Sequence, residues 1–132
     1  MLQTFSVSTR EGIQFINIDS DVRRIVNDTG IKEGYCIVFV PHTTAAVTIN
    51  ENADPDVVRD MIMETSKIVP FSDGYRHAEG NSAAHIKASF FGSSELVLIS
   101  SGDLVFGTWQ SLFFCEFDGP RTRKVIVQVF DA

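Results

Sequence analysis

The chain has 132 residues and a formal net charge of −6, and 44% of its residues are hydrophobic while 21% are charged. This balance is typical of one folded domain, residues 1–132, and excludes a disordered chain. The acidic charge removes any general case for nucleic acid or an anionic membrane surface as a partner, and no run of about 18 apolar residues could span a bilayer. We therefore expect a cytoplasmic protein.

Two strands, a helix and a third strand are predicted first. The segments FSVST and IQFINI alternate around the turn REG, which predicts a β-hairpin. Asp19 or Ser20 is expected to cap a short helix that Gly30 ends. Residues 35–40 are almost all apolar, so they predict a strand buried on both faces that stops at Pro41.

A strand over residues 46–49 then leads into a second helix. Asp54 is expected as its N-cap and Pro55 as its first residue, and the helix should end before Pro70. Four residues follow at the spacing of one helical face, which predicts a buried stripe: Val58, Met61, Ile62 and Thr65.

The remainder begins with a long polar loop. A third helix, AAHIKASFF, is expected to start at Asn81 or Ser82 and to stop at Gly92, which places His85 in its first turn. The segments ELVLIS, LVFGTWQSLFFCEF and KVIVQVF then predict strands, separated by the turns SGD and DGPR. Cys115 lies in the second of these segments. We expect both Cys115 and Cys36 to be buried and reduced thiols. The pattern predicts an α+β domain with about three helices, whose sheets fold over one core.

All three histidines fall in two polar, turn-forming segments. His42 stands in PHTTAA, and His77 and His85 stand in YRHAEGNSAAH. We expect the three to converge in one site, where three imidazoles would meet the need of a catalytic zinc ion for three protein ligands. The alternative is that each histidine makes only local hydrogen bonds near its turn, and the spacing matches no zinc finger and no HExxH helix.

Further polar residues are candidates for catalysis or substrate binding. Glu51 and Glu79 can act as a general base or orient a histidine, or they can merely cap turns. Arg121 and Arg123 suit phosphate oxygens, although two solvated arginines on a hairpin fit the pattern as well. The remaining substrate-binding candidates offer hydroxyl or amide groups: Thr43, Thr44, Asn81, Thr108 and Gln110.

Three long segments resemble the YjbQ family of small bacterial and archaeal proteins, also called UPF0047. They are VFVPHTTAAVTINENADPDVVRDM, HAEGNSAAHIKASFFGSS and GTWQSLFFCEFDGPRTRKV, which cover nearly the whole chain in order. The resemblance implies one α+β domain with a β-sandwich-like core of mostly antiparallel strands, assembled as a homotrimer. It also implies a site around His42, His77 and His85 that holds a divalent metal ion.

The resemblance further implies an activity, thiamine-phosphate synthase, a transferase that joins a pyrimidine methyl diphosphate to a thiazole phosphate and releases pyrophosphate. Magnesium would suit the phosphates but prefers oxygen ligands, whereas three imidazoles suit zinc or another transition ion. Three hypotheses follow: an enzyme acting on a small phosphorylated or heterocyclic metabolite with this activity, a zinc-type hydrolase, and a non-enzymatic trimeric ligand-binding module.

Overall fold

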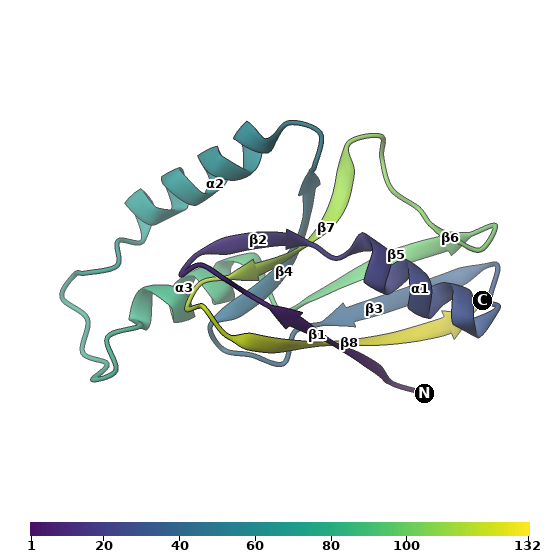
Figure 1. Ribbon diagram of the computed structural model, residues 1–132, viewed down its shortest axis with the longest axis horizontal. Helices are drawn as coiled ribbons and strands as arrows, with labels where there is room; N and C mark the ends of the chain where they lie inside the picture. The colour runs from purple at the N-terminus through teal and green to yellow at the C-terminus, as the bar shows by residue number, and fades with distance from the viewer.

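The computed structural model describes residues 1–132 and contains two β-sheets flanked by three helices (Figure 1). The larger sheet consists, in spatial order, of β1 (Gln3–Ser8), β8 (Thr122–Asp131), β3 (Gly34–Phe39), β5 (Ser94–Ser100) and β6 (Asp103–Leu104). The smaller sheet consists of β2 (Gln14–Asn17), β7 (Gln110–Glu116) and β4 (Ala45–Glu51). All the strand pairs are antiparallel. The predicted α+β fold with a sandwich-like core is confirmed.

The main hydrophobic core lies between the two sheets, where α1 (Asp19–Thr29) fills one end. Val22 and Val26 of α1 pack with Val38 and Val127 of the larger sheet and with Phe114 of the smaller one. Successive strand residues point to opposite faces, so only every second residue of β3 and β8 reaches this core. The core therefore joins both sheets and α1 into one unit.

The C-terminus of α1 is formed as predicted, whereas its N-terminus is not. Gly30 ends the helix with a φ of 72°, the left-handed conformation that was predicted. The predicted N-terminal cap is wrong, because Ile18 precedes the helix and no side chain caps it. Asp19 instead accepts a hydrogen bond from the backbone N–H of Leu112 at 2.7 Å, which ties the start of α1 to β7.

Two predictions about strands are wrong. The N-terminal strands do not form a hairpin, because β1 pairs with β8 in the larger sheet while β2 pairs with β7 in the smaller one. The β3 strand is not buried on both faces: Cys36 and Val38 face the core, whereas Ile37 and Phe39 are 37% and 41% exposed. The outer face of the larger sheet is therefore apolar and exposed, and Tyr35 and Phe130 stack on it with ring centroids 4.8 Å apart.

Helix α3 (Ser82–Phe91) covers the other face of the smaller sheet (Figure 1). Its small residues Ala84 and Ala88 pack against Ala46, Phe113 and Cys115 in a second hydrophobic cluster. Alanine lets a helix approach a sheet closely. The helix begins after Asn81 and ends before Gly92, so His85 lies in its first turn as predicted.

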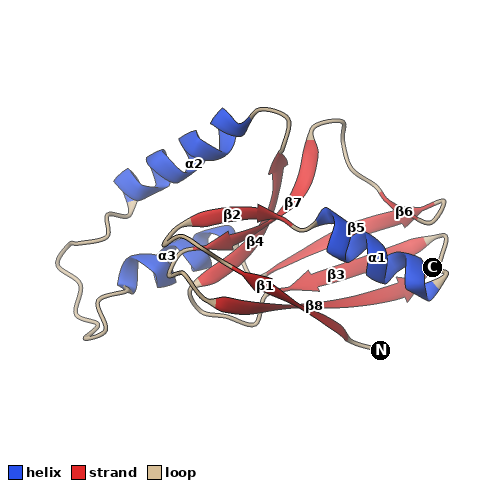
Figure 2. Cartoon of the chain, viewed as in Figure 1, coloured by secondary structure: helices blue, strands red, loops and turns tan.

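Helix α2 (Pro55–Ile68) stands away from the sheets at one end of the molecule (Figure 2). Asp54 caps it by accepting a hydrogen bond from the N–H of Asp56 at 2.9 Å, and Pro55 is its first residue, both as predicted. The predicted buried stripe is wrong, because α2 contains no buried residue and its apolar face is only partly covered. None of the three helices has the length and apolar character that a membrane-crossing helix needs.

Candidate functional site

The three histidines line one pocket of about 420 Å³. Three segments far apart in the sequence supply its walls: the β3–β4 loop, the α2–α3 loop with the start of α3, and the β7–β8 turn with the start of β8. None of the eleven lining residues is hydrophobic: Pro41, His42, Thr43, Thr44, His77, Glu79, Asn81, His85, Asp118, Arg121 and Arg123.

His42 is fixed between its own loop and β8. Its Nε2 accepts a hydrogen bond from the backbone N–H of Lys124 at 2.9 Å, which uses the lone pair of that nitrogen. Burial, followed by the positive charge of Arg123, lowers the pKa of His42, and the negative charge of Glu116 opposes them. His42 is therefore a neutral imidazole that carries its proton on Nδ1.

His77 and His85 form a pair at the α2–α3 junction. Their rings meet edge to face, with centroids 5.4 Å apart and an angle of 90° between the planes. Gly80, at a φ of 77°, reverses the loop, and its N–H donates to the carbonyl of His77 at 3.2 Å. This turn, followed by the first turn of α3, brings the two imidazoles together although eight positions separate them in the sequence.

Asp118 connects the β7–β8 turn to the start of α3. Its Oδ2 accepts hydrogen bonds from Asn81 Nδ2 at 2.9 Å and from Arg121 Nη2 at 2.8 Å, and its carbonyl accepts one from Arg121 Nε at 2.7 Å. The remaining amide oxygen, Asn81 Oδ1, is buried and has no hydrogen-bond partner. A buried acceptor without a donor destabilises the fold by roughly 1–3 kcal/mol, so a donor in the pocket would remove that cost.

Arg123 lies behind the pocket in a buried ion pair with Glu116, and the two are 4% and 0% exposed. Arg123 Nε donates to Glu116 Oε1 at 2.8 Å, and Arg123 Nη2 donates to Oε2, so the pairing has two points of contact. Thr9 Oγ1 and the N–H of Asp118 also donate to Glu116, each at 2.9 Å. Burial alone raises the pKa of Glu116, but these hydrogen bonds hold it below its usual range. Arg123 Nη2 also donates to Thr44 Oγ1 at 2.9 Å and so orients the pocket wall.

The β7–β8 turn passes directly over this ion pair. A Cβ atom on Gly119 would lie 2.3 Å from the carbonyl oxygen of Glu11 and 2.8 Å from Cγ of Glu116, so only glycine fits there. The turn is held further by the N–H of Arg121, which donates to Thr9 Oγ1 at 2.8 Å. These contacts fix the backbone positions of Asp118 and Arg121 in the pocket.

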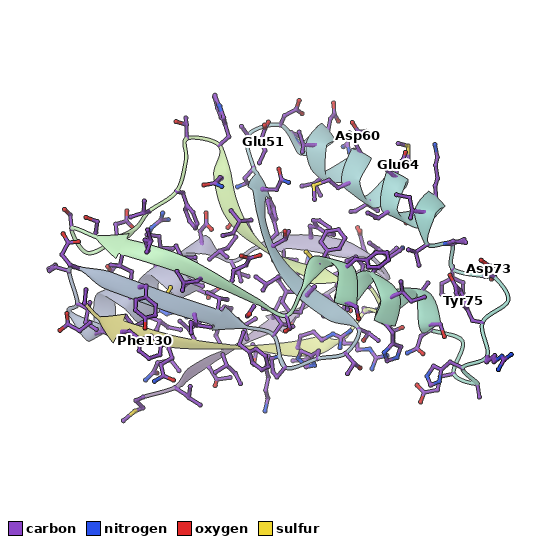
Figure 3. The ribbon with its side chains drawn as sticks, turned by 180° about the vertical axis from the view of Figure 1, so that it is seen from behind. Glu51, Asp60, Glu64, Asp73, Tyr75 and Phe130 are labelled. Carbon is purple, nitrogen blue, oxygen red and sulfur yellow. The ribbon has the colours of Figure 1, made fainter.

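Three of the predicted site residues lie outside the pocket. Glu51 ends β4, six residues from the pocket end of that strand and about 20 Å away at the rise of a β-strand. Figure 3 shows Glu51 near the start of α2, well apart from the loop that carries Asp73 and Tyr75. Gln110 Oε1 accepts the N–H of Gly107 at 2.8 Å and closes a turn, and Thr108 is exposed in the same turn.

Two residues that organise the site were missed from the sequence. Glu116 interrupts the apolar run LFFCEF, and a charge in such a run indicates a buried partner, here Arg123 on the next strand of the chain, in the other sheet. Asp118 stands in the turn DGPR, where aspartate is expected for local reasons alone. Its contact with Asn81, 37 positions away, has no local signal.

The prediction of a three-histidine metal site is wrong. No group of three or more histidine, cysteine, aspartate or glutamate side chains is placed to hold a metal ion. His42 already uses its Nε2 lone pair on Lys124, and His77 and His85 meet edge to face. Zinc, another transition ion and magnesium each stay a prediction as a cofactor, and no chemical step is assigned to a metal.

Relatives and solved structures cover almost the whole chain. UPF0047 protein YugU of Bacillus subtilis is 45% identical over 130 residues, which is 98% of each chain. UPF0047 protein MJ1081 of Methanocaldococcus jannaschii is 41% identical over 98% of this chain and 94% of the relative. A crystal structure from Clostridium acetobutylicum, described as an uncharacterized conserved protein of the yjbq/upf0047 family, superimposes with a TM-score of 0.96 at 50% identity and covers 97% and 99% of the two chains.

These relatives correct the functional expectation. Their names carry no activity, and a neighbour from Sulfolobus solfataricus, with a TM-score of 0.95, 32% identity and coverage of 100% and 97%, is described as a YbjQ-like protein of unknown function. The prediction of thiamine-phosphate synthase activity is wrong on these findings, since nothing in them supports it. The zinc-type hydrolase lacks its metal-ligand set as well.

The family itself is clear. The family described as UPF0047 protein YjbQ-like matches residues 3–132. The match contains all three segments on which the resemblance was noted, including the pocket residues of HTTAA and GNSAAH. The chain belongs to the UPF0047 YjbQ-like family.

Proposed function

We propose that the polar pocket binds a small phosphorylated metabolite and that His77 and His85 transfer protons to and from it. The single observation that carries the proposal is the composition of the pocket: three imidazoles and two guanidinium groups line it, and no hydrophobic residue does. Such a lining favours a ligand that is charged and rich in hydrogen-bonding groups over an apolar one.

Arg121 supports the choice of a phosphate group. Its side chain is 51% exposed, and only its Nε and one N–H of Nη2 are used on Asp118. The three remaining N–H groups are free to bind phosphate oxygens at two points. Arg123 lines the pocket too, but its hydrogen bonds go to Glu116 and Thr44 and its charge is balanced by Glu116, so Arg121 is the guanidinium available to a ligand.

Asn81 supports a ligand that also carries a hydroxyl or amino group. Its buried Oδ1 lacks a donor, and the residue lines the pocket. The Nδ2 of the same amide is bonded to Asp118, so the amide cannot turn over without losing that contact. A ligand N–H or O–H would satisfy Oδ1 and fix the orientation of the bound molecule.

The histidine pair supports acid–base chemistry. Imidazole is the side chain that exchanges protons most readily near neutral pH, and two adjacent rings let one accept a proton while the other donates one. Glu79 lines the same pocket and is the nearest candidate along the chain to orient His77. The neutral His42 supplies a further N–H donor.

Inorganic phosphate tests the binding half of the proposal. We expect wild-type protein to bind phosphate, measured by isothermal titration calorimetry, and Arg121→Met to weaken binding by roughly tenfold or more, because hydrogen bonds to a charged group are lost. Arg59→Met is the matched control, since Arg59 pairs only with Asp56 on exposed α2. No phosphate binding by the wild type would contradict the anion site.

A panel of phosphorylated metabolites followed by ³¹P NMR tests the chemical half. We expect His85→Gln to lower the turnover of an accepted substrate by about 10²–10⁴-fold, the usual contribution of general acid–base catalysis, while phosphate binding is kept. Turnover that survives the substitution would contradict the role of the histidine pair.

Assembly as a homotrimer is the second part of the proposal. The exposed apolar face of the larger sheet supports it, because apolar patches of this kind are typical of protein–protein contacts, and Leu96 and Leu98 on that face are 55% and 58% exposed. Light scattering on the wild type should give three times the monomer mass, and Leu98→Glu should lower it. A wild type that is monomeric would contradict this part.

A further inference from the structure

A second cavity, of about 460 Å³, lies on the opposite side of α3 from the histidines. His85 and Lys87 are two positions apart on the helix, which turns 200° between them, so their side chains point to opposite sides. His85 lines the polar pocket and Lys87 lines the second cavity. The cavity has five hydrophobic lining residues, unlike the polar pocket: Ile13, Phe71, Ala83, Ala84 and Phe117.

Lys87 is a buried amine with almost no polar partners. The residue is 4% exposed, and its Nζ donates one hydrogen bond, to Ser66 Oγ on α2 at 3.1 Å. The centroid of the Phe117 ring lies 5.9 Å from Nζ. None of the five ion pairs of the protein includes Lys87. A charged ammonium is disfavoured in such a place, and burial lowers the pKa of Lys87 accordingly.

The walls of the cavity discriminate between kinds of ligand. Glu11 borders it, and its carboxylate disfavours an anion. The apolar side chains favour a hydrophobic body. Burial lowers the pKa of Lys87, so its ammonium gives up a proton more readily than that of a solvated lysine, and the free amine is a nucleophile toward carbonyl carbon. The ligand that suits all three features is a neutral aldehyde or ketone with an apolar body.

We infer that Lys87 forms an imine with such a carbonyl compound in this cavity. The lone pair of Nζ forms a bond to the carbonyl carbon, the nitrogen gives up its two protons, and the carbonyl oxygen leaves with them as water. No electrons are gained or lost, so no oxidant or reductant takes part. This inference is independent of phosphate binding in the polar pocket.

Reductive trapping in the full-length wild-type protein tests it. Benzaldehyde and sodium cyanoborohydride convert an imine to a stable benzylamine, and peptide mass spectrometry then measures labelling at each of the four lysines: Lys32, Lys67, Lys87 and Lys124. We expect Lys87 to be labelled severalfold more than Lys67, which is exposed on α2 beside Ser66. With 4-carboxybenzaldehyde, which has the same ring and a negative charge, the excess at Lys87 should fall while the other lysines are labelled as before.

Two controls distinguish the effect of the cavity from the intrinsic reactivity of the Lys87 amine. Unfolding in guanidinium chloride should make all four lysines equally reactive, and His85→Gln, at a residue that does not line the Lys87 cavity, should leave the labelling of Lys87 unchanged. Labelling of Lys87 that is no faster than that of Lys67 in the folded wild type would overturn the inference. So would a preference for Lys87 that persists after unfolding. Because the decisive comparison is made within the wild type, it does not depend on whether any variant folds.

Discussion

Arg123 and Lys87 are both buried cations, yet their surroundings differ completely. Arg123 is 4% exposed and has a carboxylate partner at two points, with Thr44 as a further acceptor. Lys87 is equally buried, but a single hydroxyl oxygen accepts its hydrogen bond. Burying a charge is unfavourable unless a partner compensates it. The pairing therefore makes Arg123 a structural element that positions a site, whereas Lys87 has no carboxylate partner and is suited to chemistry.

The largest effect should come from breaking the compensated pair. Arg123→Met leaves Glu116 buried without its cation, and we expect the free energy of unfolding to fall by about 3–5 kcal/mol. Urea denaturation followed by circular dichroism measures it. The double variant Glu116→Leu with Arg123→Met removes both charges and should lose less than the single variant. A loss below about 1 kcal/mol in Arg123→Met would mean that the pair does not hold the site together.

A smaller effect of opposite sign is expected at the other cation. Lys87→Met keeps the volume and removes an uncompensated charge, so the free energy of unfolding should rise by about 1 kcal/mol. Lys67→Met makes the same substitution at an exposed lysine and should change the free energy of unfolding little. If Lys87→Met destabilises the protein as strongly as Arg123→Met does, the contrast between the two cations is wrong.

The smallest effect concerns the pH dependence at His42, which Arg123 influences. The folded state holds the pKa of His42 below its ordinary value of 6.5, so the unfolded chain takes up the proton first as the pH falls. The stability that this residue contributes is present above pH 6.5 and is lost below it. Between about pH 7.5 and about pH 5.5, the free energy of unfolding measured in urea should decrease less in His42→Gln than in the wild type. Equal decreases would show that His42 titrates normally.

Local signals in the sequence predicted local structure. Asp54 and Pro55 mark the start of α2, and Gly30 and Gly92 follow the ends of α1 and α3, because caps and stops depend on a few adjacent residues. Strand pairing depends on distant residues, so the hairpin expected around REG was wrong. The stripe on α2 has the right periodicity, but periodicity does not say how closely a helix approaches the sheets.

The same contrast between features set by adjacent residues and features set by distant residues applies to the candidate site. The histidines could be assigned to one site because they are rare and stand in polar turns, and the structure places all three in one pocket. Glu51 was predicted as a candidate general base, yet it lies at the far end of β4. Lys87 was overlooked, since a lysine on a helix is normally solvated and only the packing of Phe117 and α2 makes it buried.

Helix α2 gives the Lys87 cavity a wall that can open. Ser66 lies on α2 and Phe71 follows it, and both line the cavity, although α2 itself contains no buried residue. An element that buries so little opens locally at a small fraction of the global free energy of unfolding. Its amide hydrogens should exchange with solvent well before those of β8, which is paired on both sides in the larger sheet. The frequency of this local opening, more than the shape of the closed cavity, then sets how fast a carbonyl compound reaches Lys87.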